Sequence, residues 1–156
     1  MRARLVVVPA FALLLSGCLG ATLSDLFEPS TASGGITKPL KTSDLVGSWG
    51  LAAYHRGADA AKVEQAARGE CGQPYRIAAG RSGSVMMHLP DQTQTSEMVV
   101  KPGLTGTYIG PAGEGGGLKD REVVKWDGRV LALRWLDPEV ASRYGTMVFA
   151  RCGGRA

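Results

Sequence analysis

Short alternating runs of apolar and polar residues make up most of the chain after residue 44. These runs end at Gly, Pro or Asp-Gly signals, which is typical of antiparallel strands. Because closing a sheet removes both exposed edges, we expect an all-β domain, a small antiparallel up-and-down barrel of about eight strands. The predicted strands lie near residues 45–53, 75–79, 85–89, 95–101, 105–109, 122–126, 131–135 and 144–152.

The apolar period changes to that of a helix over residues 57–69. Ala60, Val63 and Ala67 follow one side of this helix, Asp59 is placed to cap it, and a glycine ends it. At about ten residues the helix would be marginal alone and needs the barrel to hold it. We therefore expect one short helix after the first strand.

The N-terminus has the pattern of a secretory signal. Two arginines precede an apolar run from Leu5 to Leu15 that is too short to span a membrane. Leu15-Ser16-Gly17-Cys18 resembles the lipobox of bacterial lipoproteins, in which the Cys is acylated and the chain is cut before it. The resemblance implies a signal peptide over 1–17 and a diacylglyceryl, palmitate-bearing Cys18 that anchors the protein to a membrane. The alternative is an ordinary secretory signal with an incidental Cys.

Residues 18–43 are rich in Pro, Gly, Ser and Thr and have no sustained apolar period. We interpret them as the lipidated Cys and a flexible tether, followed by the domain over 44–153 and a short tail over 154–156. In lipoproteins of the Gram-negative type, an Asp directly after the acylated Cys retains the protein in the inner membrane. Leu19 stands at that place, so the resemblance implies an anchor in the outer membrane.

The charge of the mature chain is low. Cleavage after residue 17 would remove both signal arginines and lower the formal net charge from +4 to +2. No cluster of Lys and Arg remains that would neutralise a row of phosphates. We therefore expect no nucleic-acid partner.

The remaining cysteines form a pair. With Cys18 committed to lipid, Cys71 and Cys152 are left in an oxidising compartment, where an even pair is typical of a disulfide. A redox pair or a metal site is the alternative, but the chain has no C-x-x-C and each Cys stands alone. We expect a structural disulfide.

No catalytic or metal site is predicted, and no cofactor. His55 and His88 are the only histidines, and neither has the neighbours of a zinc site or a catalytic triad. We expect both at the surface or rim. Glu122 shares strand parity with Val124 and Trp126, so its carboxylate would face inward toward a cationic ligand or, preferably, lie at a solvated rim.

A glycine-rich run in the second half of the chain also predicts no binding site. The run Gly113–Gly117 has no Gly-Lys-Ser/Thr ending and no helix pattern follows it, so it does not form a phosphate loop. We interpret it as a mobile connection between strands.

The first strand opens with Gly47-Ser48-Trp49, and this Gly-x-Trp resembles the opening of the calycin barrels. That group includes the lipocalins and the small periplasmic inhibitors of alkaline metalloproteases. In lipocalins the opening Trp packs under a basic side chain of the last strand. The resemblance implies that Trp49 packs under Arg151 and closes the barrel. The alternative is a core Trp of an unrelated small barrel.

We expect a lipid-anchored envelope protein with a non-enzymatic binding or structural β domain, similar to the protease inhibitors. Its partners would be the membrane, through the lipid, and an envelope protein or protease. The alternative is a carrier of a small apolar ligand inside the barrel. An enzyme ranks last because no nucleophile–base pair is apparent.

Overall fold

The computed structural model describes residues 35–55 and 59–153. The predicted signal sequence, Cys18 and residues 19–34 of the predicted tether lie outside the described residues, as does the predicted tail. No helix within the described ranges has the length and apolar character needed to cross a membrane.

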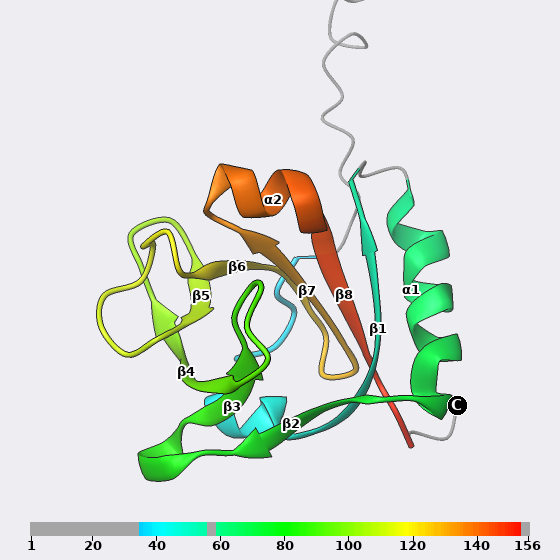
Figure 1. Cartoon of the computed structure of the whole chain (residues 1–156), viewed down its shortest axis with the longest axis horizontal. Coiled ribbons are helices and arrows are strands. Elements are labelled where there is room, and N and C mark those ends of the chain that lie inside the picture. The colour runs from blue at the N-terminus through cyan, green and yellow to red at the C-terminus, as the bar shows by residue number, and fades with distance from the viewer. Residues whose placement is uncertain (1–34, 56–58, 154–156) are drawn as a thin grey trace, which may run out of the picture. The chain divides into compact units, whose positions relative to one another are not determined.

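Eight antiparallel strands form a closed barrel (Figure 1). Each strand pairs with the next in sequence, and β8 pairs with β1, which closes the sheet. The predicted all-β barrel is therefore confirmed. The strands are β1 (Gly47–Tyr54), β2 (Tyr75–Ala79), β3 (Val85–His88), β4 (Thr95–Pro102), β5 (Thr107–Gly110), β6 (Arg121–Trp126), β7 (Val130–Trp135) and β8 (Thr146–Arg151).

Apolar side chains of the strands fill the inside of the barrel. Successive side chains of a strand point to opposite faces, so a regular strand contributes alternate residues to this core. The cluster also includes Leu45, from the 3-10 helix η2 (Thr42–Leu45) that precedes β1. The buried members are Leu45, Trp49, Ile77, Val85, Met87, Met98, Ile109, Val123, Trp126, Leu131, Leu133 and Phe149.

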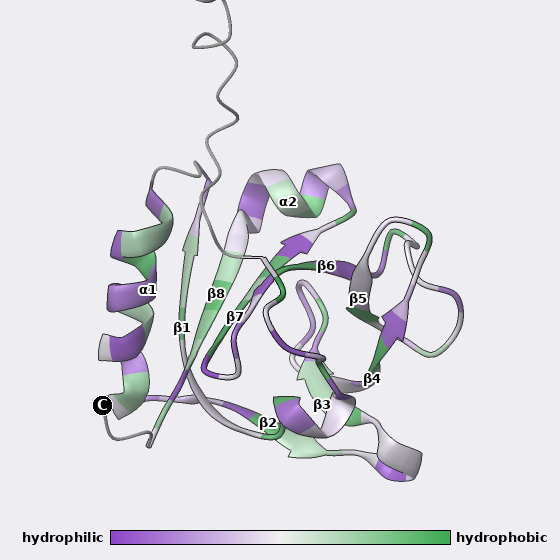
Figure 2. Cartoon of the chain, turned by 180° about the vertical axis from the view of Figure 1, so that it is seen from behind, coloured by the Kyte–Doolittle hydropathy of each residue, from purple (hydrophilic) through white to green (hydrophobic). Residues whose placement is uncertain are grey.

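The predicted helix is present as α1 (Ala60–Gly69), and Figures 1 and 2 show it running alongside β1. Ala67 is buried and Val63 partly buried in a second apolar cluster on the outside of the barrel. Asp59 directly precedes the helix, but its side chain makes no capping hydrogen bond, so the predicted cap is wrong. The helix is held by packing rather than by this cap.

The strands under α1 carry small residues that let the helix approach closely. A Cβ added at Gly50 would lie 1.7 Å from the carbonyl oxygen of Ala67. Ala150 of β8 and Ala132 of β7 belong to the same outer cluster. These strands are therefore apolar on both faces, inward to the core and outward to α1.

A second α-helix, α2 (Pro138–Tyr144), lies between β7 and β8 and was not predicted. Asp137 caps it by accepting hydrogen bonds from the backbone N–H groups of Glu139 (2.9 Å) and Val140 (3.3 Å). Pro138 occupies the first turn, where its missing N–H costs nothing. An Asp-Pro pair ends a strand and is also the signature of a helix start.

The segment before β1 contacts the barrel earlier than the predicted domain boundary at residue 44. Ile36 forms a parallel bridge with Trp126, and the Thr37 N–H donates to the Trp126 carbonyl oxygen at 2.9 Å. Leu40 packs against the core. Residues 35–43, assigned to the tether from the sequence, thus include contacts of the domain itself.

A bulge in β6 changes which residues face inward. The register against β7 shifts between Val123 and Lys125, so Val123 and Trp126 both lie in the core. Val124 instead packs in the outer cluster with α1. The predicted common face of Glu122, Val124 and Trp126 is wrong for this reason.

Candidate functional site

Trp49 and Arg151 lie together at the end of the barrel where β1 begins. The two residues are directly paired between β1 and β8, and the Arg151 guanidinium carbon lies 4.1 Å from the centroid of the Trp49 ring. Trp49 is fully buried, and its Nε1 donates to the Leu45 carbonyl oxygen at 2.8 Å. This is the arrangement that the calycin resemblance implied.

The Arg151 guanidinium also hydrogen-bonds the chain before β1. It donates to the carbonyl oxygens of Asp44 and Val46, the latter at 3.2 Å. Partial burial lowers the pKa of Arg151 from its ordinary value. The side chain thus ties the last strand to the turn that leads into the first.

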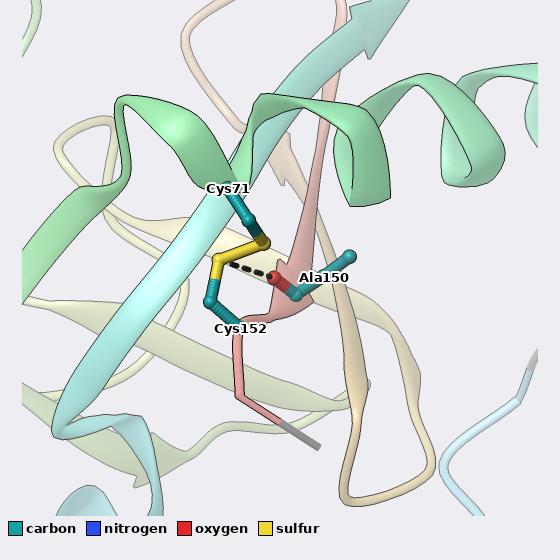
Figure 3. Close-up of a disulfide and its surroundings, with 3 residues drawn as sticks. All are labelled: Cys71, Ala150 and Cys152. Carbon is teal, nitrogen blue, oxygen red and sulfur yellow. Dashed lines mark hydrogen bonds between the residues drawn. A yellow bond between two sulfur atoms is a disulfide. The ribbon is translucent and has the colours of Figure 1, made fainter. Parts of the chain in front are cut away.

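A disulfide joins Cys71 to Cys152, as the sequence predicts (Figure 3). Cys71 lies in the 3-10 helix η4 (Glu70–Gly72) that follows α1, and Cys152 directly follows β8. Their Cα atoms are 5.6 Å apart. The bond fixes the end of α1 to the end of the last strand.

The opposite end of the barrel, where β7 ends and α2 lies, contains a buried arginine. Arg121 is only 1% exposed, and its guanidinium carbon lies 4.2 Å from the centroid of the Trp135 ring. Its Nη2 donates to the carbonyl oxygen of His88. Sequence reasoning missed this residue because the bulge in β6 hides which parity faces inward.

Arg121 has no counter-ion among the described residues. None of the ion pairs there involves it, and its Nε has no hydrogen-bond partner. Burial lowers the pKa of Arg121 to about 10, so the guanidinium stays a cation at neutral pH. A buried, incompletely paired charge costs stability, and such groups concentrate at functional sites.

The neighbouring Asp120 is already neutralised elsewhere. It is 2% exposed and pairs with the Lys101 ammonium at 2.9 Å. Its Oδ2 also accepts from the backbone N–H groups of Gly116 (2.8 Å) and Gly117 (2.9 Å). Asp120 therefore anchors the glycine-rich connection, which is predicted to be mobile, and its charge is balanced by Lys101 rather than by Arg121.

Trp135 lines a pocket of about 270 Å³ at this end. The indole is 6% exposed, and its Nε1 has no hydrogen-bond partner. The pocket lies between the β3–β4 turn, the connection before β6, the end of β7 and α2. Its apolar lining residues are Leu89, Pro90, Leu118, Trp135 and Val140.

Asp91 joins the β3–β4 turn to α2 beside this pocket. Its carboxylate accepts from Arg143 Nη2 at 2.7 Å and from the Tyr144 hydroxyl. The hydrogen bonds from Tyr144 and Arg143 hold the pKa of Asp91 below its ordinary value. Asp91 and the two α2 residues therefore form a polar link between two walls of the pocket.

The other residues considered from the sequence do not assemble into a site. His55 and His88 are both exposed, and Glu122 pairs with Arg134 of β7 on the outside of the barrel. In the part of the chain that the structure describes, no group of three or more His, Cys, Asp or Glu residues could hold a metal ion.

Comparison with protein-family models, curated proteins and solved structures finds no match to this chain. The resemblances to lipoproteins and to calycin barrels therefore depend on the residues named above.

Proposed function

We propose that this protein is a lipid-anchored component of a bacterial cell envelope whose barrel acts by binding another protein, as calycin protease inhibitors do. The observation that carries the proposal is the filled interior. Twelve buried side chains of the chain itself occupy the core. A small barrel filled in this way meets its partner on the outside.

Two exposed leucines mark a surface suited to such contact. Leu104 is fully exposed, and Leu118 is 66% exposed. They lie on the connections 103–106 and 111–119, which pack together: a Cβ added at Gly103 would lie 3.0 Å from the Gly115 carbonyl oxygen. We call these two segments the loop face. Because exposed Leu side chains gain energy when covered, the loop face is where we place the protein partner.

The lipid anchor has a direct test. Two or three acyl chains, at about 0.8 kcal/mol per buried methylene, give lasting membrane attachment where one chain does not. Cells fed labelled palmitate should label the wild-type protein and lose the label with Cys18→Ser. Cys152→Ser is the matched control and should keep it. Label in the Cys18→Ser protein would overturn the lipobox interpretation.

The protein partner is tested by purification from gently solubilised membranes. We expect a partner that binds the purified full chain saturably and, if it is a protease, loses activity in proportion to the added chain. Leu104→Ser with Leu118→Ser should weaken binding by about tenfold or more. Ala61→Ser with Ala66→Ser, on exposed positions of α1, is the control and should leave binding unchanged.

A different result of the same purification would contradict the proposal. Recovery of a bound apolar lipid, with no saturable protein partner, would overturn the proposal in favour of a carrier.

A further inference from the structure

We propose that Asp120 is a positioning residue of the loop face. Its carboxylate, neutralised by the buried Lys101, holds Leu118 beside Leu104 in the arrangement that the protein partner recognises. This role depends on the proposed function, because it prepares the same surface for binding. Three observations carry it: the place of the two leucines in their turns, the contacts that fix those turns, and the burial of the ion pair.

Leu118 lies at the tip of a turn that Asp120 closes. The Asp120 N–H donates to the Gly117 carbonyl oxygen at 2.9 Å, which leaves Leu118 and Lys119 as the two tip residues. The Asp120 Oδ2 accepts from the N–H groups of Gly116 and Gly117, at 2.8 and 2.9 Å. The backbone and the side chain of one residue therefore fix the chain on both sides of Leu118.

Leu104 lies at the tip of the neighbouring turn, which is fixed in a similar way. The Gly103 N–H donates to the Gly106 carbonyl oxygen at 2.9 Å, and Leu104 is the first of the two residues between them. Thr105 is the second, and its hydroxyl is hydrogen-bonded at 2.6 Å to the hydroxyl of the buried Tyr108. This turn is therefore tied to β5.

Tyr108 also joins this turn to the glycine-rich connection. A Cβ added at Gly103 would lie 2.5 Å from the Tyr108 Cε2, and one added at Gly115 would lie 2.9 Å from the Tyr108 Cδ2. Both segments of the loop face thus pack directly on this ring, and they lie side by side between β4, β5 and β6 (Figure 1). The two leucines are carried on one packed unit.

Leucine is an unusual residue at the tip of a tight turn. Such positions are ordinarily taken by Gly, Pro, Asn, Asp or Ser, because these residues suit the backbone or bond it. Two exposed leucines at neighbouring tips are therefore better explained by contact with a partner. A surface that is ordered before the partner arrives binds more tightly, since less conformational entropy is lost on association.

The Lys101–Asp120 pair is almost completely withdrawn from water, with exposed fractions of 8% and 2%. A buried ion pair contributes little net stability compared with an apolar pair of the same shape. The hydrogen bonds of the two side chains go to Pro111, Gly116 and Gly117, the first at 2.7 Å from the Lys101 ammonium. All three belong to the connection 111–119, so the pair selects one conformation of the loop face.

Two matched variants separate the hydrogen-bond acceptor from the ion pair. Both carry Lys101→Met, which keeps an unbranched side chain and leaves no buried cation. Asp120→Ala in the first variant removes the acceptor of the Gly116 and Gly117 N–H groups. Asp120→Asn in the second keeps an oxygen at that place. Urea unfolding establishes that both are folded, and they differ only in the side chain of residue 120.

Hydrogen–deuterium exchange of the full chain in detergent, followed by mass spectrometry, measures the order of the turn without a partner. The wild-type peptide over 111–120 should contain protected amides. The Ala variant should exchange about tenfold faster there or more, and the Asn variant should exchange as the wild type does. Peptides of α1 are the internal control and should be alike in all three proteins. If the Ala variant does not fold, exchange in the wild type and the Asn variant decides.

Binding is measured with the protein partner recovered from gently solubilised membranes. The Ala variant should bind about tenfold more weakly than wild type, and the Asn variant within about threefold of it. When Leu118→Ser is already present, adding the two changes of the Ala variant should weaken binding little further. A residue that acts through Leu118 has no effect once that side chain is gone.

Four results would overturn this inference alone. They are unprotected amides over 111–120 in the wild type, wild-type binding by the Ala variant, equal losses in the Ala and Asn variants, and a full additional loss in the Leu118→Ser background. The absence of any saturable protein partner would instead overturn the proposed function, and the role of Asp120 with it.

Discussion

Arg151 covers the ring of Trp49 from the directly paired position of the neighbouring strand, at 4.1 Å from ring centroid to guanidinium carbon. Because the same guanidinium also bonds the chain before β1, the pair joins the first and last strands where the barrel closes. This contact leads to the first prediction.

Trp49 and Arg151 should be energetically coupled. Trp49→Ala should cost about 3–5 kcal/mol, since a fully buried indole leaves a cavity that collapses only in part. Trp49→Phe and Arg151→Lys are milder, and a double-mutant cycle by urea unfolding should give a coupling of about 0.5–1 kcal/mol. Effects that simply add would show that the observed stacking contributes no energy of its own.

The disulfide should contribute much of the stability. The two cysteines are 81 residues apart, and closing a loop of that length removes about 4–5 kcal/mol of unfolded-chain entropy in the loop-closure model. Cys71→Ser with Cys152→Ser should lower the free energy of unfolding by up to this amount. Urea unfolding of the wild type with reductant is the matched comparison. Equal stability with and without the bond would contradict the prediction.

Gly50 should be intolerant of any side chain. A methyl group there would lie 1.7 Å from the Ala67 carbonyl oxygen, so α1 would have to move away from β1. Gly50→Ala should destabilise the domain by about 1–3 kcal/mol. Gly69→Ala, where an added Cβ has nothing within 4 Å, is the control and should be neutral or slightly stabilising. A tolerated Gly50→Ala would show that the helix is packed loosely.

The link between Asp91 and α2 should weaken in acid. The hydrogen bonds from Tyr144 and Arg143 lower the pKa of Asp91 in the folded chain. The ionised carboxylate therefore stabilises the fold fully at any pH above the pKa of Asp in the unfolded chain, about 3.9. This stabilisation is lost as the pH falls through the folded-state pKa of Asp91, which is lower.

Asp91→Asn should therefore be less stable than wild type at pH 6, and the difference should disappear as the pH is lowered below about 4. Urea unfolding across this range measures it. Asp59→Asn is the control, since that carboxylate makes no capping hydrogen bond. A difference that stays constant down to pH 2 would show that the variant acts through something other than the charge of Asp91.

The sequence predicts the barrel well because its signals are local. Alternation and turn residues locate the eight strands, and the spacing of Ala60, Val63 and Ala67 locates α1. The cysteine pair was predicted from the compartment and the count alone. The strand and helix signals depend on neighbours in the chain, and the disulfide follows from the two cysteines that remain once Cys18 is assigned to lipid. None of these signals requires knowing the register of one strand against another.

The Arg121 site could not be predicted for the opposite reason. One extra residue between Val123 and Lys125 reverses the faces of β6, and nothing in the local pattern reveals it. An arginine at the start of a strand is ordinarily expected in solvent. Its burial against Trp135 follows from the register with β7, which only the three-dimensional structure supplies.

The disulfide also divides the chain into two mechanical parts. Seven strands, β2 to β8, lie between Cys71 and Cys152 and form a covalent ring. β1 and α1 lie outside it, and β1 fills the gap between β2 and β8. A pulling force on the N-terminal side of β1 can therefore extend only β1 and α1 before it reaches a covalent stop. Extraction of β1 opens the barrel along both of its ladders, β1–β2 and β1–β8, while the disulfide keeps the ring of β2 to β8 closed.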